Sequence, residues 1–123
     1  MTLAVRPWDP GLGLLQLSTL RGALEREGMA TAWWSDMPGT HVAAHAHDFA
    51  ETRWVLSGFL RVTAGAATLE LGPGDRLDLP AGTPHATEVV GLAPVIYVTG
   101  MAAGTPTTRP CSAAGSASRP DCR

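Results

Sequence analysis

The chain has 123 residues, of which 45% are hydrophobic, so it is long enough to bury one core and hardly two. Its formal net charge is −2 and no block of like charges appears, which argues against a nucleic acid or an anionic membrane as a partner. The N-terminus lacks the basic stretch and apolar run of a secretion signal, and Gly, Pro or charge interrupts every later apolar run, so the sequence predicts a cytoplasmic protein.

The first predicted element is an amphipathic helix between Leu12 and Gly28. Leu17, Leu20 and Leu24 fall on one stripe at helical spacing, and Gly28 is a typical stop. We therefore expect an N-terminal segment, residues 1–28, whose helix packs on a barrel or on a partner subunit.

From Met29 onward the pattern changes to short runs rich in β-branched and aromatic residues, cut at regular intervals by Gly and Pro. Roughly seven such segments fit before residue 101, and many short strands without helices between them predict an antiparallel sandwich or barrel over residues 29–101. Alternation with period 2 allows one group of side chains to face a common core: Leu69, Leu71, Leu77 and Leu79.

The remaining residues, 102–123, are small, polar and rich in Pro, which is typical of a disordered tail. Both cysteines of the chain, Cys111 and Cys122, lie in this segment. They define no disulfide framework and lack the further ligands that a metal site would need, so we interpret them as incidental.

Three of the four histidines and one glutamate occur in two clusters, His45-Ala-His47-Asp-Phe-Ala-Glu51 and Thr83-Pro-His85. Residues two apart on a strand point the same way, so His45 and His47 present both imidazoles to one side, and a turn after them could bring Glu51 beside them. His85 must come from a neighbouring strand, which closure of a small barrel can supply. Imidazole suits Zn, Cu, Fe and Ni, and a carboxylate widens the choice to Mn, so the pattern predicts one divalent metal ion.

These residues resemble the two motifs of the cupin superfamily over roughly residues 38–100. The stretch similar to the first motif is Gly39-x5-His45-x-His47-x3-Glu51-x6-Gly58, and the stretch similar to the second is Gly74-x5-Pro80-x-Gly82-x2-His85. One departure exists, because Val89 stands where the family often has Asn. That Asn is not a metal ligand, so the departure leaves the predicted ligands unchanged.

The resemblance implies an all-β fold, a double-stranded β-helix of the jelly-roll or cupin-barrel type, preceded here by the one N-terminal helix. It also implies one divalent ion per chain, with Fe, Mn, Zn and Ni all open. The implied ligands are His45, His47, Glu51 and His85. Cupins commonly form dimers, so a homodimer is expected.

Arg53 is the candidate for contact with a substrate. It lies two residues after Glu51, so on a regular strand it points into the same cavity and could bind a substrate carboxylate through two hydrogen bonds. An arginine at the barrel mouth or in a salt bridge is an equally good interpretation. His41 shares the parity of His45, but a single bulge would reverse it, and a surface position is favoured.

The aromatic residues of the strands are interpreted as packing residues. Trp33, Trp34 and Trp54 lie in strand segments, and Trp54 with Leu56 faces away from Glu51, where it needs cover from the helix, the other sheet or a second subunit. Tyr97 is expected in the core with its hydroxyl satisfied, and a pocket donor is the minority interpretation.

Two functions fit this pattern, and the ligands do not choose between them. The first is a metal-dependent enzyme that acts on a small organic molecule, with dioxygenase-, isomerase- or lyase-type chemistry. The alternative is a non-catalytic cupin that binds a small ligand or a metal. A third reading, a purely structural metal, would require a coordination shell closed by protein.

Overall fold

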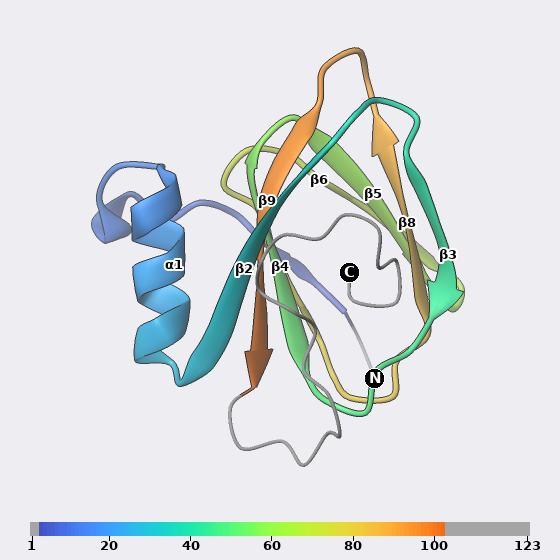
Figure 1. The fold of residues 1–123 in the computed structure, drawn as a ribbon, viewed down its shortest axis with the longest axis horizontal. Coiled ribbons are helices and arrows are strands. Elements are labelled where there is room, and N and C mark those ends of the chain that lie inside the picture. Colours follow the sequence, from blue (N-terminus) through green and yellow to red (C-terminus); the bar gives the residue numbers. More distant parts are fainter. Residues whose placement is uncertain (1–2, 103–123) are drawn as a thin grey trace.

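A computed structural model describes residues 3–102, whose strands form two antiparallel sheets that face each other (Figure 1). One sheet has five strands in the order β1-β7-β4-β9-β2, and the other has four in the order β3-β8-β5-β6. The strands are β1 (Val5–Arg6), β2 (Met29–Asp36), β3 (His41–His45), β4 (Glu51–Ser57), β5 (Phe59–Ala64), β6 (Ala67–Leu71), β7 (Arg76–Leu79), β8 (His85–Val90) and β9 (Val95–Ala102). The predicted double-stranded β-helix of the jelly-roll type is therefore confirmed, and the described residues contain one α-helix, which lies between β1 and β2 in the chain.

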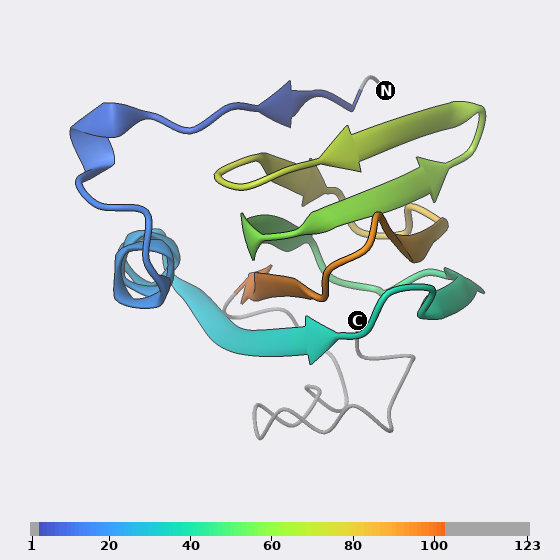
Figure 2. The same cartoon turned by 90° about the horizontal axis from the view of Figure 1, so that it is seen from above.

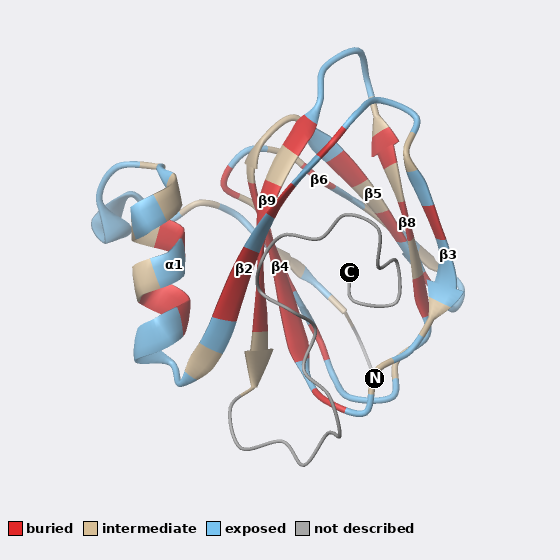
Figure 3. Cartoon of the chain, viewed as in Figure 1, coloured by how far each residue is buried: buried red, intermediate tan, exposed pale blue. Residues whose placement is uncertain are grey.

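The apolar core lies between the two sheets, where buried positions run along the strands (Figure 3). The predicted alternation is confirmed: Leu71, Leu77 and Leu79 are at most 2% exposed, and Leu69 packs against them. Trp34 is buried in the same core, whereas its neighbour Trp33 points outward and is 46% exposed. Successive side chains on a strand alternate between the two faces, so the two tryptophans cannot share one environment.

The helix α1 (Leu17–Arg26) begins later than the sequence predicted. The predicted start at Leu12 is wrong because Pro10–Leu12 forms a separate 3₁₀ turn and Gly13, at φ 106°, leaves the helical conformation. The predicted apolar stripe is confirmed, since Leu20 and Leu24 are fully buried and Leu17 packs against the same cluster.

This helix lies on the outer face of the five-stranded sheet, on the side away from β3 and β8 (Figures 1 and 2). Its leucines form one cluster with Trp54 and Val98 of that face, and Leu56 packs against the cluster. The cover that the sequence required for Trp54 is thus supplied by the helix. None of the helices within residues 3–102 is both long and apolar enough to cross a membrane.

The N-terminal segment adds a strand that the sequence did not predict. β1 pairs with β7 through Val5↔Leu77 and Arg6↔Arg76, and Arg6 also reaches Asp78 at 2.8 Å. A two-residue strand carries too little periodicity to be recognised. The predicted tail lies outside the described residues apart from Ala102, and so do Cys111 and Cys122.

Candidate metal centre

The candidate site forms where β3, β4 and β8 begin or end at one end of the barrel. His45 is the last residue of β3 and pairs in register with His85, the first residue of β8. A register shift interrupts β3 between Val42 and His45. His41 lies before this shift and is exposed opposite Glu88 on β8, which agrees with the favoured surface interpretation.

His47 and Glu51 reach the same place by different means. His47 lies in the loop after β3, where Gly82 donates a 2.7 Å backbone hydrogen bond to its carbonyl oxygen. Phe49 is buried and stacks on the His47 ring, with the ring centroids 4.7 Å apart. The loop then turns into β4, whose first residue is Glu51. The position of His47 is therefore set by the hydrogen bond from Gly82 and by the stacking of Phe49.

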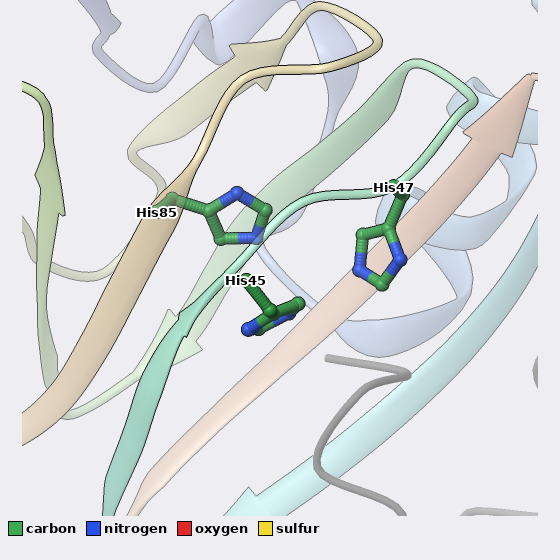
Figure 4. Close-up of side chains that lie close together, drawn as sticks. All are labelled: His45, His47 and His85. Carbon is green, nitrogen blue, oxygen red and sulfur yellow. The ribbon is translucent and has the colours of Figure 1, made fainter.

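The three histidine rings face one another across a small common space (Figure 4). One ligand atom from each of His45, His47 and His85 lies within 4.8 Å of the others. Two nitrogens that bind one zinc-like ion at about 2.1 Å lie up to roughly 4 Å apart, so small side-chain adjustments bring these atoms into range.

The hydrogen bonds of the rings determine which nitrogens face this space. His45 Nδ1 lies 2.9 Å from the carbonyl oxygen of Ala43, and His85 Nδ1 lies 2.9 Å from that of Thr83. A carbonyl oxygen can only accept, so both Nδ1 atoms carry the proton and donate it. In a neutral ring the lone pair is then on Nε2, which is the arrangement of a metal-binding histidine held by an outer partner.

Glu51 is buried beside the histidines, at 3% exposure. Its Oε1 lies 2.9 Å from His85 Nε2 and 3.8 Å from His47 Nε2. The 2.9 Å approach lacks hydrogen-bond geometry, so both Nε2 atoms and Glu51 Oε2 are buried without a hydrogen-bond partner among the described residues. Buried polar atoms without partners are costly, and these converge from three elements.

The electrostatics favour the charge states that bind a cation. Burial alone would raise the pKa of Glu51, but the charge of Arg53 and the contacts with His85 and His47 outweigh it and hold this pKa below its ordinary value. Burial lowers the pKa of His47, with Glu51 opposing the change. A carboxylate and a neutral imidazole are the forms that ligate metals.

Arg53 lies in the barrel interior on the same face of β4 as Glu51, as the sequence predicted from parity. It is fully buried, and its Nη2 lies 3.4 Å from Glu51 Oε1, which is long for a charge-assisted hydrogen bond. Its guanidinium carbon lies 5.5 Å from the ring centroid of Tyr97. The Nε and Nη1 atoms of Arg53 have no partner among the described residues.

Tyr97 lies next to Arg53 in the barrel interior. It is 1% exposed and its hydroxyl donates to Asp36 Oδ2 at 3.4 Å, so the expected core position is what the structure has. Trp34 Nε1 donates to Thr99 Oγ1 at 3.0 Å on the neighbouring stretch of β9. Trp34 and Tyr97 both belong to the core cluster, so these hydrogen bonds satisfy polar groups inside the core.

Sequence reasoning missed the residues that hold the site in place. Phe49 stacks on the His47 ring, and the carbonyl oxygens of Ala43 and Thr83 accept hydrogen bonds from His45 and His85; none of the three is a candidate ligand. Phe49 lies between His47 and Glu51 in the sequence, and its apolar character could have suggested a packing role beside them. No sequence signal marks the two carbonyl oxygens, because every residue carries one.

The donor set fits a divalent metal ion. Histidine nitrogens with fixed tautomers, a buried carboxylate and several buried atoms without partners occupy one small volume. Among the described residues, those that could hold an ion are His45, His47 and His85, with Glu51 2.9 Å from the last of them.

Comparison with known proteins agrees with the geometry. The profile of the cupin domain family matches residues 32–101. No curated protein matches the chain closely enough to count as a relative.

Solved structures give the same fold. A protein with a double-stranded β-helix domain from Klebsiella pneumoniae is 26% identical, with a TM-score of 0.58 over 65% of this chain and 71% of that one. A predicted oxalate decarboxylase from Thermotoga maritima, 19% identical, has a TM-score of 0.57 over 67% of this chain and 72% of that one. A mutant of Bacillus subtilis oxalate decarboxylase is 25% identical, with a TM-score of 0.55; the match covers 60% of this chain but only 21% of that one.

Proposed function

Because this chain belongs to the cupin domain family, we propose that it binds one divalent metal ion through His45, His47, Glu51 and His85 and uses it to act on a small organic molecule. One observation carries the proposal. Three histidine ligand atoms from separate segments lie within 4.8 Å, and Nε2 of both His47 and His85 is buried without a hydrogen-bond partner among the described residues. Such a cluster is costly unless an ion satisfies it.

A bound ion would supply Lewis-acid chemistry and could polarise an oxygen atom of the bound molecule. Glu51 would bring the negative charge that offsets the ion, and His45 and His85 would keep their Nε2 lone pairs aimed inward through the carbonyl contacts at Nδ1. Dioxygenase-, isomerase- and lyase-type reactions are all compatible with four protein ligands that leave positions open. The similarity to an oxalate decarboxylase supports a small-molecule substrate.

The test of this proposal is metal content. We expect protein expressed without added metal to carry about one divalent ion per chain by elemental analysis, and His45→Ala or His85→Ala to weaken metal affinity at least tenfold, since loss of even a supporting group costs this much. His41→Ala is the matched control, because His41 is exposed and lies outside the cluster. Equal metal content in all variants would contradict the proposal. Glu51→Gln with unchanged metal content would remove Glu51 alone from the ligand set.

The alternative is a cupin that binds a small ligand or metal without turnover. A panel of small organic acids and carbonyl compounds separates the two functions. If a chelator abolishes turnover and Fe(II) or another divalent ion restores it, the protein is an enzyme. Retention of metal with ligand uptake and no turnover favours the binding function.

A further inference from the structure

Arg53 is the strongest unexplained feature of the barrel interior. Its side chain is fully buried, yet Nε and Nη1 have no hydrogen-bond partner among the described residues. A guanidinium stays charged at all accessible pH values, and two unmet donors on a buried charge are costly. The nearest carboxylate, Glu51, approaches only Nη2, at 3.4 Å. The remaining donors therefore call for an acceptor that residues 3–102 do not provide.

The charge of the site indicates the sign of that acceptor. Once Glu51 serves a divalent ion, its single negative charge faces both the ion and Arg53, while the three histidines are neutral. Asp36, the other buried carboxylate among residues 3–102, accepts from Tyr97 and pairs with Val95 at the far end of β2. The site is left with an excess of positive charge, which an anion would neutralise.

The spacing indicates the size of the anion. Glu51 Oε1 is shared between Arg53 Nη2 at 3.4 Å and His85 Nε2 at 2.9 Å, so the guanidinium and the histidine cluster are separated by about one small chemical group. The Tyr97 ring lies 5.5 Å from the Arg53 guanidinium, and its hydroxyl is directed to Asp36. If an acid binds Arg53 through its carboxylate, an oxygen atom on the carbon next to that carboxylate would thus lie close to the histidines.

We propose that Arg53 binds the carboxylate of a small 2-oxo or 2-hydroxy acid through two adjacent donors, Nη2 and either Nε or Nη1, while the oxygen on the neighbouring carbon of the acid lies at the histidine cluster. This proposal rests on the proposed function, and it names the class of molecule that the metal site takes. A planar guanidinium matches a carboxylate through two parallel hydrogen bonds, which an uncharged amide or ester cannot reproduce.

The experiment is calorimetric titration of Mn(II)-loaded protein with glycolate, and with glycolamide as the uncharged analogue of equal size. Metal content is measured on each sample first. We expect glycolate to bind the native protein at least tenfold more tightly than glycolamide, and Arg53→Gln to remove about 10- to 100-fold of the glycolate affinity while the metal stays bound. Arg53→Lys should retain part of this affinity. Arg61→Gln is the matched control, because Arg61 pairs with Glu70 and Glu88 on the outer face.

Each outcome bears on one proposal or both. Metal-loaded native protein that does not distinguish glycolate from glycolamide overturns the anion site and leaves the metal site standing, and this comparison needs no variant to fold. Variants with native melting curves and unchanged glycolate affinity overturn it in the same way. Protein that takes up no Mn(II), yet binds glycolate in an Arg53-dependent manner, supports the anion site and contradicts the metal site. Protein that holds no metal and binds no glycolate contradicts both.

Discussion

At the scale of single residues, polar side chains are buried as deeply as the leucines of the core. His85 and Glu51 are as deeply buried as Leu79, yet their polar atoms meet in one small volume. A protein built only for stability would fill these positions with hydrophobic side chains, because buried polar atoms without partners destabilise the fold. Their presence at these positions supports the proposed metal site.

Gly58 shows why one motif residue cannot be replaced. It adopts φ 80°, and a Cβ atom there would clash with the carbonyl oxygen of Pro94. We expect Gly58→Ala to lower the free energy of unfolding by more than about 2 kcal/mol, since both backbone strain and a steric clash oppose the methyl group. Denaturant unfolding measures the loss.

Gly65→Ala is the control for this prediction. Gly65 also has a positive φ, 61°, but no atom lies within 4 Å of its added Cβ. Only the conformational penalty applies, so a loss of about 1 kcal/mol is expected. Equal losses at the two glycines would show that the contact with Pro94 has no energetic weight.

At the scale of elements, the helix and the N-terminal strand are held to the sheet by ionic contacts as well as by leucines. Glu27, the C-cap of α1, accepts two hydrogen bonds from Arg76 of β7, at 2.7 and 2.8 Å. Arg76 also contacts Asp78 at 3.1 Å and lies over the Trp54 ring, which the helix covers. This cluster links three segments that are distant in the sequence.

Glu27→Gln should weaken this link in a pH-dependent manner. The hydrogen bonds from Arg76 hold the pKa of Glu27 below its ordinary value, against a smaller opposing effect of burial. A lowered pKa in the folded state means that the stabilisation is complete above the ordinary glutamate pKa of about 4.3 and is lost as pH falls through the lowered value. We expect a loss of about 1–2 kcal/mol at pH 7, kept modest by the partial exposure of Glu27.

Thermal unfolding of the native protein and Glu27→Gln between pH 7 and pH 2.5 tests this. The two melting temperatures should converge at the acidic end. Glu70→Gln is a control at pH 7, because its contact with Arg61 joins two well-exposed side chains and should contribute less than about 1 kcal/mol. A constant difference across the whole pH range would contradict the assignment to the Glu27 carboxylate.

At the scale of the whole molecule, the proposed ion would add a link between segments that the sheets and the hydrogen bond from Gly82 to His47 already bring together. β3, the loop that carries His47, β4 and β8 each contribute one donor. The unfolded chain offers no such preformed cluster, so binding favours the folded state. The expected homodimer stays a prediction; the edge strand β2 carries the half-exposed Trp33, but the structure contains one chain.

Removal of metal should therefore lower the stability of the protein. At a free-ion concentration one hundred times the dissociation constant, the bound ion adds about 2.7 kcal/mol to the free energy of unfolding. We expect a chelator to lower the melting temperature of native protein and to leave that of His85→Ala unchanged. A native melting temperature that is the same with and without bound metal would mean that folded and unfolded chains bind the ion equally well.

The sequence alone determined the kind of fold and the composition of the candidate site. Leu71, Leu77 and Leu79 alternate with period 2, and this pattern specifies which strand face is buried wherever the strand lies in space. The spacing of His45 and His47 likewise grouped these two residues, and the resemblance to the second cupin motif added His85. The two-residue spacing from Glu51 was sufficient to predict that Arg53 faces the interior beside it. This spacing could not reveal which nitrogen atoms of Arg53 lack partners.

Only the tertiary structure decided the features that depend on contacts between distant segments. Three such contacts are the pairing of β1 with β7, the hydrogen bond from Gly82 to His47 and the hydrogen bonds from Arg76 to Glu27. The paired residues are far apart in the sequence, so no periodic pattern of residue types predicts that they meet. The helix began late because Gly13 took a conformation that its neighbours did not dictate. Burial of the Arg53 donors is likewise a property of the folded barrel, because the side chain loses contact with water only when distant segments such as the one that carries Tyr97 pack around it.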